Sequence, residues 1–289
     1  MDYYTRFCEN LKLKGYAKRS RQSYLRALRQ LQNFFSKPLD EITEEEVREY
    51  WLYCKDELKW GTATLRISYS GIKHFFTHTI TREWPLLSEV KFKREDSLPV
   101  VLSVDDVRAI LKALPAGQSR TFYETVYSLG LRLTEAITLQ VRDIDSKRML
   151  VHVHGGKGAS DRLVPLPETT LYSLRKYWKT HHNAVWLFPA RGRNGKGGPD
   201  AERPVSACTV QTALTRTVKR LKLDKHVHPH TFRHSYATHL LEANVPVRHV
   251  QDYLGHKNLA STTVYLHLTT AGKQESHSRI NQLMRGVTS

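Results

Sequence analysis

The first 80 residues repeat apolar positions at the spacing of amphipathic helices. Residues 19–35 place four apolar side chains on one helical face: Tyr24, Leu28, Leu31 and Phe35. Thr43 and Glu46 have the spacing of a capping box and predict the start of a further helix. Glycines and short polar turns separate about four such segments, which predicts a small helical bundle.

The helical period stops at residues 81–101, where two prolines and dense charge predict a linker. Ser103 and Asp106 then form a second capping signal, which opens a new helix. We therefore divide the chain into a helical domain at residues 1–95 and a second domain at residues 96–289.

The second domain mixes helical and extended patterns. Two apolar runs, "MLVHV" and "RLVPL", are separated by a glycine-rich polar turn and predict a β-hairpin. A short strand is expected at "VWLFP", residues 185–189. Helical patterns occupy residues 119–139 (interrupted at Gly130) and about 168–180, 206–222, 230–243, 246–253 and 273–285. The expected fold class is mainly α with a small β-sheet, as a helical bundle followed by a mixed α+β domain.

The charge of the chain indicates its kind of partner. The chain contains 45 Lys and Arg but only 28 Asp and Glu, which gives a net charge of +17. Residues 97–289 carry +13 of it, which favours a polyanionic partner such as nucleic acid. No apolar run is long enough for a membrane span, so no membrane partner is expected. Three scattered cysteines without a CxxC pair are typical of a reducing cytoplasm and argue against a cysteine zinc site.

Two cationic side chains of the second domain could bind an anion. Arg132 precedes Glu135 by three residues, so the two share a helix face, and the carboxylate could orient the guanidinium toward a phosphate. An ordinary surface ion pair is the plain alternative. Lys157 lies in the glycine-rich turn and either reaches a bound anion or is simply solvated. That turn is not a nucleotide-binding P-loop, since GxxxxGK[ST] does not occur in the chain.

Five histidines occur in residues 226–240, "HVHPHTFRHSYATHL". Pro229 suits the start of a helix on which His230 and Arg233 share a face and could meet one anionic group. His230 and His234 have the spacing of a zinc pair, but no acidic residue stands between them and no third ligand is obvious. We therefore expect no metal here and interpret His234 as helix packing.

Four stretches occur together in this half: "GLRLTE", "GGKG", "HPHTFRHSYATHL" and "LGHKNLASTTVYLH". In this order they resemble the tyrosine recombinase (phage integrase) family, and within it Xer-type recombinases and integron integrases. The resemblance covers almost the whole chain, and the third and fourth motifs are its most specific part. Phe232 stands where the family pattern has leucine, and Ser160 where many relatives have a second lysine.

The resemblance implies an N-terminal SAM-like domain that binds DNA and a catalytic domain that cleaves and rejoins DNA. It implies a catalytic set of six residues: Arg132, Lys157, His230, Arg233, His256 and Tyr265. In the implied mechanism the tyrosine attacks a phosphodiester and forms a 3′-phosphotyrosyl bond, with His230 as its general base. The two arginines and His256 bind the phosphate, Lys157 protonates the leaving oxygen, and Glu135 orients Arg132. No cofactor is expected.

The implied partner is double-stranded DNA, with four copies of the chain assembled on two paired sites. Candidates for contacts with DNA in the first domain are Arg21, Arg26, Arg29 and Lys73. The target sequence and accessory proteins cannot be read from the chain. Three alternatives stay open: a type IB topoisomerase that nicks and reseals, a DNA-binding relative without catalysis, and a histidine-based metalloprotein.

Overall fold

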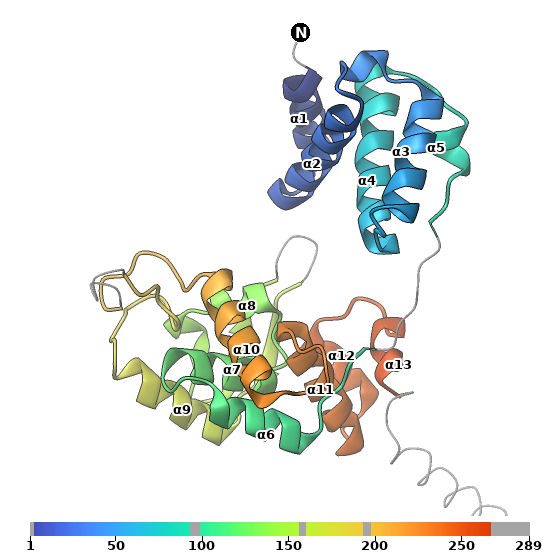
Figure 1. The fold of residues 1–289 in the computed structure, drawn as a ribbon. Helices are drawn as coiled ribbons and strands as arrows, with labels where there is room; N and C mark the ends of the chain where they lie inside the picture. Colours follow the sequence, from blue (N-terminus) through green and yellow to red (C-terminus); the bar gives the residue numbers. More distant parts are fainter. Residues whose placement is uncertain (1–2, 93–98, 156–159, 193–197, 267–289) are drawn as a thin grey trace, which may run out of the picture. The chain divides into compact units, whose positions relative to one another are not determined.

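A computed structural model describes residues 3–92, 99–155, 160–192 and 198–266. The chain forms two compact units, Met1–Ser97 and Leu98–Ser289. Within the described ranges helices dominate, and the strands form one three-stranded sheet (Figure 1). The expected class, mainly α-helical with a small β-sheet, is confirmed. Every helix in these ranges is too short or too polar to cross a membrane.

In residues 3–92, the first unit is built from helices and turns without a strand. They are α1 (Tyr3–Leu13), α2 (Lys18–Phe35), α3 (Glu44–Asp56), α4 (Thr62–Phe75) and α5 (Leu86–Glu89), with a 3-10 turn at Leu39–Glu41 and a π-helical turn at Phe76–Ile80. Leu28 and Leu31, predicted on the apolar face of α2, are fully buried. The capping box predicted at Thr43 and Glu46 is confirmed, since each residue accepts a hydrogen bond from the other's backbone N–H.

Part of the segment expected to be a featureless linker is helical. Residues Leu86–Glu89 form α5, and both Leu86 and Leu87 are buried in the core of this unit. The hydroxyl of Tyr69 donates a hydrogen bond to the carbonyl of Leu87 (2.6 Å). The backbone N–H of Leu86 also donates a hydrogen bond to Oε1 of Glu44 (2.6 Å), so two hydrogen bonds and two apolar side chains anchor this turn. A helix of four residues is too short to show a helical period in the sequence.

The second unit combines helices with the small sheet (Figure 1). Its helices are α6 (Val104–Ala113), α7 (Gln118–Ser128), α8 (Leu133–Ile137), α9 (Glu168–Trp178), α10 (Ala207–Leu221), α11 (Pro229–Glu242), α12 (Val247–Leu254) and α13 (Ala260–Leu266). A 3-10 turn at Val141–Asp143 leads into β1 (Ile144–Asp145), followed by β2 (Leu150–Val153) and β3 (Arg162–Pro165). The strands are antiparallel in the order β1-β2-β3, with Val153 opposite Arg162.

The predicted hairpin is confirmed, but one predicted strand is wrong and one strand was missed. Residues 185–189 form isolated bridges, Trp186 with Gln140 and Pro189 with Pro204, rather than a strand. Strand β1 was not predicted, because two residues are too few to show an alternating pattern. The helix predicted near residues 273–285 lies outside the described ranges.

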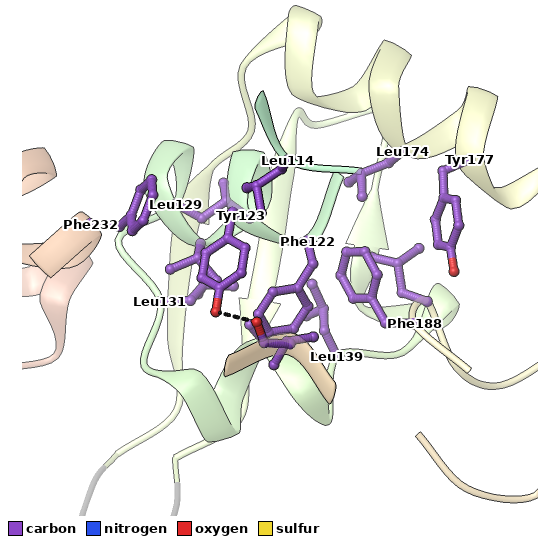
Figure 2. Close-up of a cluster of buried hydrophobic side chains, with 14 of the residues drawn as sticks. Leu114, Phe122, Tyr123, Leu129, Leu131, Leu139, Leu174, Tyr177, Phe188 and Phe232 are labelled. Carbon is purple, nitrogen blue, oxygen red and sulfur yellow. Dashed lines mark hydrogen bonds between the residues drawn. The ribbon is translucent and has the colours of Figure 1, made fainter. Parts of the chain in front are cut away.

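The core of the second unit holds α7 and α11 together. Figure 2 shows Phe122, Tyr123 and Phe232 in this cluster, and the hydroxyl of Tyr123 donates to the carbonyl of Val210 (3.0 Å). The rings of Tyr123 and Phe232 lie 5.2 Å apart, and both side chains are fully buried. Phe232 stands between His230 and Arg233 in the sequence, so its burial fixes the rotation of α11 that presents those two side chains.

A glycine on α4 permits a close approach of two helices in the first unit. A Cβ atom built on Gly71 would lie 3.0 Å from the Cα atom of Tyr24, on α2. The obstacle is backbone, which cannot turn aside as a flexible side chain would. A Cβ built on Gly61, at the start of α4, would meet nothing within 4 Å.

We therefore expect Gly71→Ala to destabilise the first unit by about 1–3 kcal/mol, because α2 and α4 must separate. Stability should fall even though alanine is a better helix former than glycine. Urea denaturation followed by the fluorescence of the tryptophans in this unit measures it. Gly61→Ala is the matched control and should change stability by less than about 1 kcal/mol. Equal stability of the two variants would contradict the close packing of these helices.

Candidate active site

A buried carboxylate, that of Glu135, lies among several predicted site residues. A turn at Gly130 ends the preceding helix, so Arg132 stands just before α8 and Glu135 falls in its first turn. Arg132 donates from its backbone N–H to Oε2 of Glu135 (2.8 Å) and from Nη1 to Oε1 (2.7 Å). Arg162, at the start of β3, donates Nη1 and Nη2 to the same two oxygens (3.0 and 2.8 Å). One carboxylate therefore holds two guanidinium groups from distant parts of the sequence.

These contacts keep Glu135 ionised. Burial raises the pKa of Glu135, but the hydrogen bonds and charges of Arg162 and Arg132 outweigh that effect and bring its pKa to about 2. Only 7% of the residue is exposed, so the arginines replace water as its hydrogen-bond donors. The expected contact between Arg132 and Glu135 is therefore present, but it is a buried network rather than a surface pair.

Arg233, on α11, approaches the same carboxylate from the other side. Its Nη1 donates to the carbonyl of Gly130 (2.7 Å), its Nη2 donates to the carbonyl of Leu254, and Nη1 lies 3.8 Å from Oε2 of Glu135. Burial, with the nearby charge of Arg132, lowers the pKa of Arg233 to about 9, which leaves it a cation at neutral pH. Arg132 keeps 32% of its side chain exposed, so it is the more accessible of the two guanidinium groups.

Tyr265, on α13, places its hydroxyl beside a histidine of α11. Its Oη lies 2.8 Å from Nδ1 of His234, and only 3% of the residue is exposed. Its ring stacks nearly parallel to that of His256, with centroids 6.4 Å apart, and Nδ1 of His256 lies 2.9 Å from Oγ1 of Thr262. Burial raises the pKa of Tyr265, while the charges of Arg233 and Arg132 act in the opposite direction.

His230 occupies the first turn of α11 and is exposed at the surface. Loss of hydration lowers its pKa, and so do the charges of Arg233 and Arg132. His230 therefore lies close to both arginines and is mainly neutral at pH 7. Its ring centroid is 6.4 Å from that of His234, so the two histidines are neighbours on the same side of the helix.

The structure thus brings together five of the six predicted catalytic residues: Arg132, His230, Arg233, His256 and Tyr265. Lys157, the sixth, lies outside the described residues. The predicted candidates for DNA contacts lie on α2 and α4 of the first unit: Arg21, Arg26, Arg29 and Lys73. Arg26 and Arg29 are exposed, whereas Lys73 donates a hydrogen bond to the hydroxyl of Tyr69 (3.3 Å).

Two residues of the site were not found from the sequence. Arg162 appeared only as the polar flank of a predicted strand, and nothing in its spacing signals the ion pair with Glu135. His234 was interpreted as helix packing, which was wrong, because it bonds the hydroxyl of Tyr265. Its position one helical turn after His230 put it on the correct face, but only the placement of α13 reveals its partner.

The arrangement suits chemistry on a tetrahedral anion. Arg132 and Arg233 supply permanent positive charge, and the rings of His230 and His256 supply neutral donors or acceptors close to them. A phenol stands next to these groups, with arginine charges that favour its ionised form. A preformed set of cations of this kind stabilises negative charge that develops during a reaction.

The Glu135 network leads to a prediction for stability. We expect Glu135→Gln to destabilise the second unit by about 3–5 kcal/mol at pH 7, since Arg162 becomes a buried charge without its counter-ion. Because the folded state lowers the pKa of Glu135, its contribution is complete above the ordinary pKa of about 4.3 and is lost as pH falls toward about 2. The difference between wild type and variant should therefore shrink by more than half at pH 3. Urea denaturation at the two pH values measures it.

Asp105→Asn is the matched control for this prediction. Asp105 pairs with Arg108 on the surface of α6, where 86% of its side chain is exposed. Its loss should change stability by less than about 1 kcal/mol at either pH. If Glu135→Gln is as mild as this control, the buried network does not stabilise the fold as described.

Both units of the chain are similar to known proteins. Residues 100–271 match the phage integrase family, and residues 3–86 match the N-terminal SAM-like domain of phage integrases. The chain is 31% identical over 273 residues to a tyrosine recombinase XerC of Chromobacterium violaceum, covering 90% of this chain and 88% of that protein. It is 30% identical over 311 residues to an integrase/recombinase of Escherichia coli, covering 95% and 92%.

Among solved structures, the lambda integrase tetramer bound to a Holliday junction matches with a TM-score of 0.72 at 18% identity, covering 91% of this chain and 76% of that one. This likeness concerns the fold alone. The family match covers more than half of the chain, and the sequence relatives cover most of its length. The chain therefore belongs to the phage integrase family and is a tyrosine recombinase.

Proposed function

We propose that this protein is a site-specific recombinase whose Tyr265 forms a 3′-phosphotyrosyl bond with DNA. The observation that carries the proposal is the position of the Tyr265 hydroxyl, which is buried, bonded to a histidine and within the field of Arg132 and Arg233. A phenol has an ordinary pKa of about 10, so it needs a base and nearby positive charge to act as a nucleophile. This site offers both.

In the proposed reaction, Oη of Tyr265 bonds to the phosphorus and the bond from phosphorus to the 5′ oxygen breaks. His230 takes the phenol proton, and Lys157 donates a proton to the departing 5′ oxygen. Arg132, Arg233 and His256 bind the phosphate oxygens on which negative charge accumulates. A 5′-hydroxyl from another strand then attacks the phosphotyrosyl bond and releases Tyr265. Strand exchange needs no external energy, because the bond energy is retained throughout.

We further propose that four copies act on two paired sites of duplex DNA in the cytoplasm. The solved lambda integrase tetramer on a Holliday junction supports this assembly, since the fold is alike. The exposed Arg26 and Arg29 on α2 supply positive charge for phosphate contacts, with Arg21 and Lys73 as further candidates. The segment at residues 273–285, whose sequence predicts a helix, is the candidate for docking between neighbouring copies.

Replacement of the nucleophile tests the proposal. On a nicked suicide DNA site, wild-type protein should form a covalent adduct that survives a denaturing gel, and Tyr265→Phe should form none. The variant keeps the ring and loses only Oη, so it should still bind DNA and assemble on paired sites in a native gel.

Tyr172→Phe is the control, because Tyr172 lies on α9 and is 69% exposed. It should form the adduct at the wild-type rate. An adduct that persists in Tyr265→Phe would remove this residue as the nucleophile. Relaxation of supercoiled plasmid without any recombination site would instead favour the topoisomerase alternative.

His234 has a different role from His230 in the proposed reaction, because its ring is hydrogen-bonded to the hydroxyl of Tyr265. Burial and the neighbouring His230 lower the pKa of His234 to about 4. A base this weak takes up the phenol proton poorly at neutral pH, so we assign His234 to the positioning of Tyr265. His230, more exposed and next to the arginines, remains the proposed proton acceptor.

The two histidines should therefore differ in their pH profiles. The pKa of His230 is lowered by burial and by the charges of Arg233 and Arg132, so the wild-type cleavage rate should rise with pH with a midpoint below that of an ordinary histidine. His230→Ala should lower the rate by about 100- to 10,000-fold and remove this dependence. His234→Ala should lower the rate but keep the wild-type profile, and His234→Asn should recover part of the rate. Loss of the profile in His234→Ala alone would assign the base to His234.

A further inference from the structure

Three ionisable side chains, His152, His154 and Asp161, lie together on the β2–β3 hairpin, and Asp143 meets them from the turn before β1. Nε2 of His154 lies 3.0 Å from Oδ1 of Asp143, and Nδ1 of the same ring lies 3.3 Å from Oδ2 of Asp161. Nε2 of His152 lies 3.1 Å from the same oxygen of Asp161. Asp143, His152 and His154 each offer one possible metal-ligand atom, and these three atoms lie within 4.8 Å of one another.

The fold explains why these groups meet. Val151 and Val153 of β2 point into the core, so His152 and His154 lie together on the opposite face. Val153 pairs with Arg162 in β3, which brings Asp161 across from His154. Backbone pairing alone therefore places two imidazoles beside one carboxylate.

Asp143 reaches the cluster from a different element, the turn before β1. Its Oδ2 accepts a hydrogen bond from the backbone N–H of Gln140 (2.8 Å), which leaves Oδ1 facing His154. The residue is 4% exposed, so Oδ1 is a buried acceptor that meets His154 of the hairpin. The turn thus fixes the orientation of the carboxylate before any ligand is bound.

The donor atoms are those that zinc prefers. Imidazole nitrogens and carboxylate oxygens bind Zn²⁺ at about 2.0–2.2 Å, and a tetrahedral site therefore holds its ligand atoms about 3.3 Å apart. The separation of 3.0 Å between His154 and Asp143 is close to this value. Asp161 would complete the arrangement, since a carboxylate on the second ring nitrogen is the usual partner of a metal-binding histidine.

We propose that Asp143, His152 and His154 bind one Zn²⁺ ion, with water in the fourth position and Asp161 orienting the histidines. This site differs from the sequence-based expectation that the chain holds no metal, which considered the three cysteines and the pair His230 and His234. Its three ligands join the turn before β1 to the hairpin. His154 and Asp161 also flank the segment that contains Lys157, so the ion would tie together the two ends of that segment.

Isothermal titration of the full-length protein tests the proposal without DNA. The protein is stripped with a chelator, freed of any histidine tag and titrated with ZnCl₂ at pH 7.5. We expect one site per chain in the wild type and its loss in the double variant His152→Ala, His154→Ala. Asp161→Asn should weaken binding by about 10- to 100-fold, because it removes a partner of the ligands rather than a ligand. His226→Ala, an exposed histidine outside the cluster, should bind zinc as the wild type does.

Two further measurements distinguish loss of the metal site from unfolding and report the geometry of the bound ion. Circular dichroism without metal shows whether each variant is folded, and Co²⁺ in place of zinc reports tetrahedral coordination through its visible absorption. Failure of the folded wild type to bind either ion would overturn the proposal. So would binding that the double variant retains, because the ion would then be held elsewhere, for instance by the histidines of residues 226–234. Neither result bears on the phosphotyrosyl chemistry, which is measured separately on DNA.

Discussion

The candidate site depends on one buried carboxylate, which pairs with three arginine side chains. Glu135 accepts hydrogen bonds from Arg132 and Arg162, and Arg233 stands 3.8 Å away. Positive charges gathered this closely repel one another, and without a counter-ion the folded unit would not hold them. The carboxylate offsets that repulsion from the protein side and leaves the outer edge of Arg132 accessible to solvent. The network is therefore stable in the folded protein, and its remaining positive charge favours the binding of an anion.

The same network links elements that are distant in the chain. Arg162 begins β3 and also donates from Nε to the carbonyl of Tyr253, at the end of α12. Arg233, on α11, donates to the carbonyls of Gly130 and Leu254. These backbone contacts set the distance between the turn before α8 and the turn after α12. A phosphate site built this way is preorganised, because the donors are already positioned before substrate arrives.

The tyrosine is positioned by a different kind of contact. Its ring belongs to a small apolar cluster with Ala237, Val250 and Leu254, while its hydroxyl meets the imidazole of His234. Burial alone would make this phenol harder to ionise, and the arginines act against that effect. Packing thus sets where the hydroxyl lies, and the charge of the arginines sets how readily it can react.

Much of this protein follows from the sequence itself. Helical period, capping pairs such as Thr43 with Glu46, and the glycine-rich turn between two apolar runs are local signals, because each depends on residues a few positions apart. The order of the four motifs was enough to indicate the family and its catalytic set. Contacts between distant residues leave no such signal. The pairing of Arg162 with Glu135, the bond from His234 to Tyr265 and the meeting of Asp143 with His154 exist only because tertiary packing brings those elements together. Sequence spacing determined which residues share an element and a face, and the tertiary structure decided which of them touch.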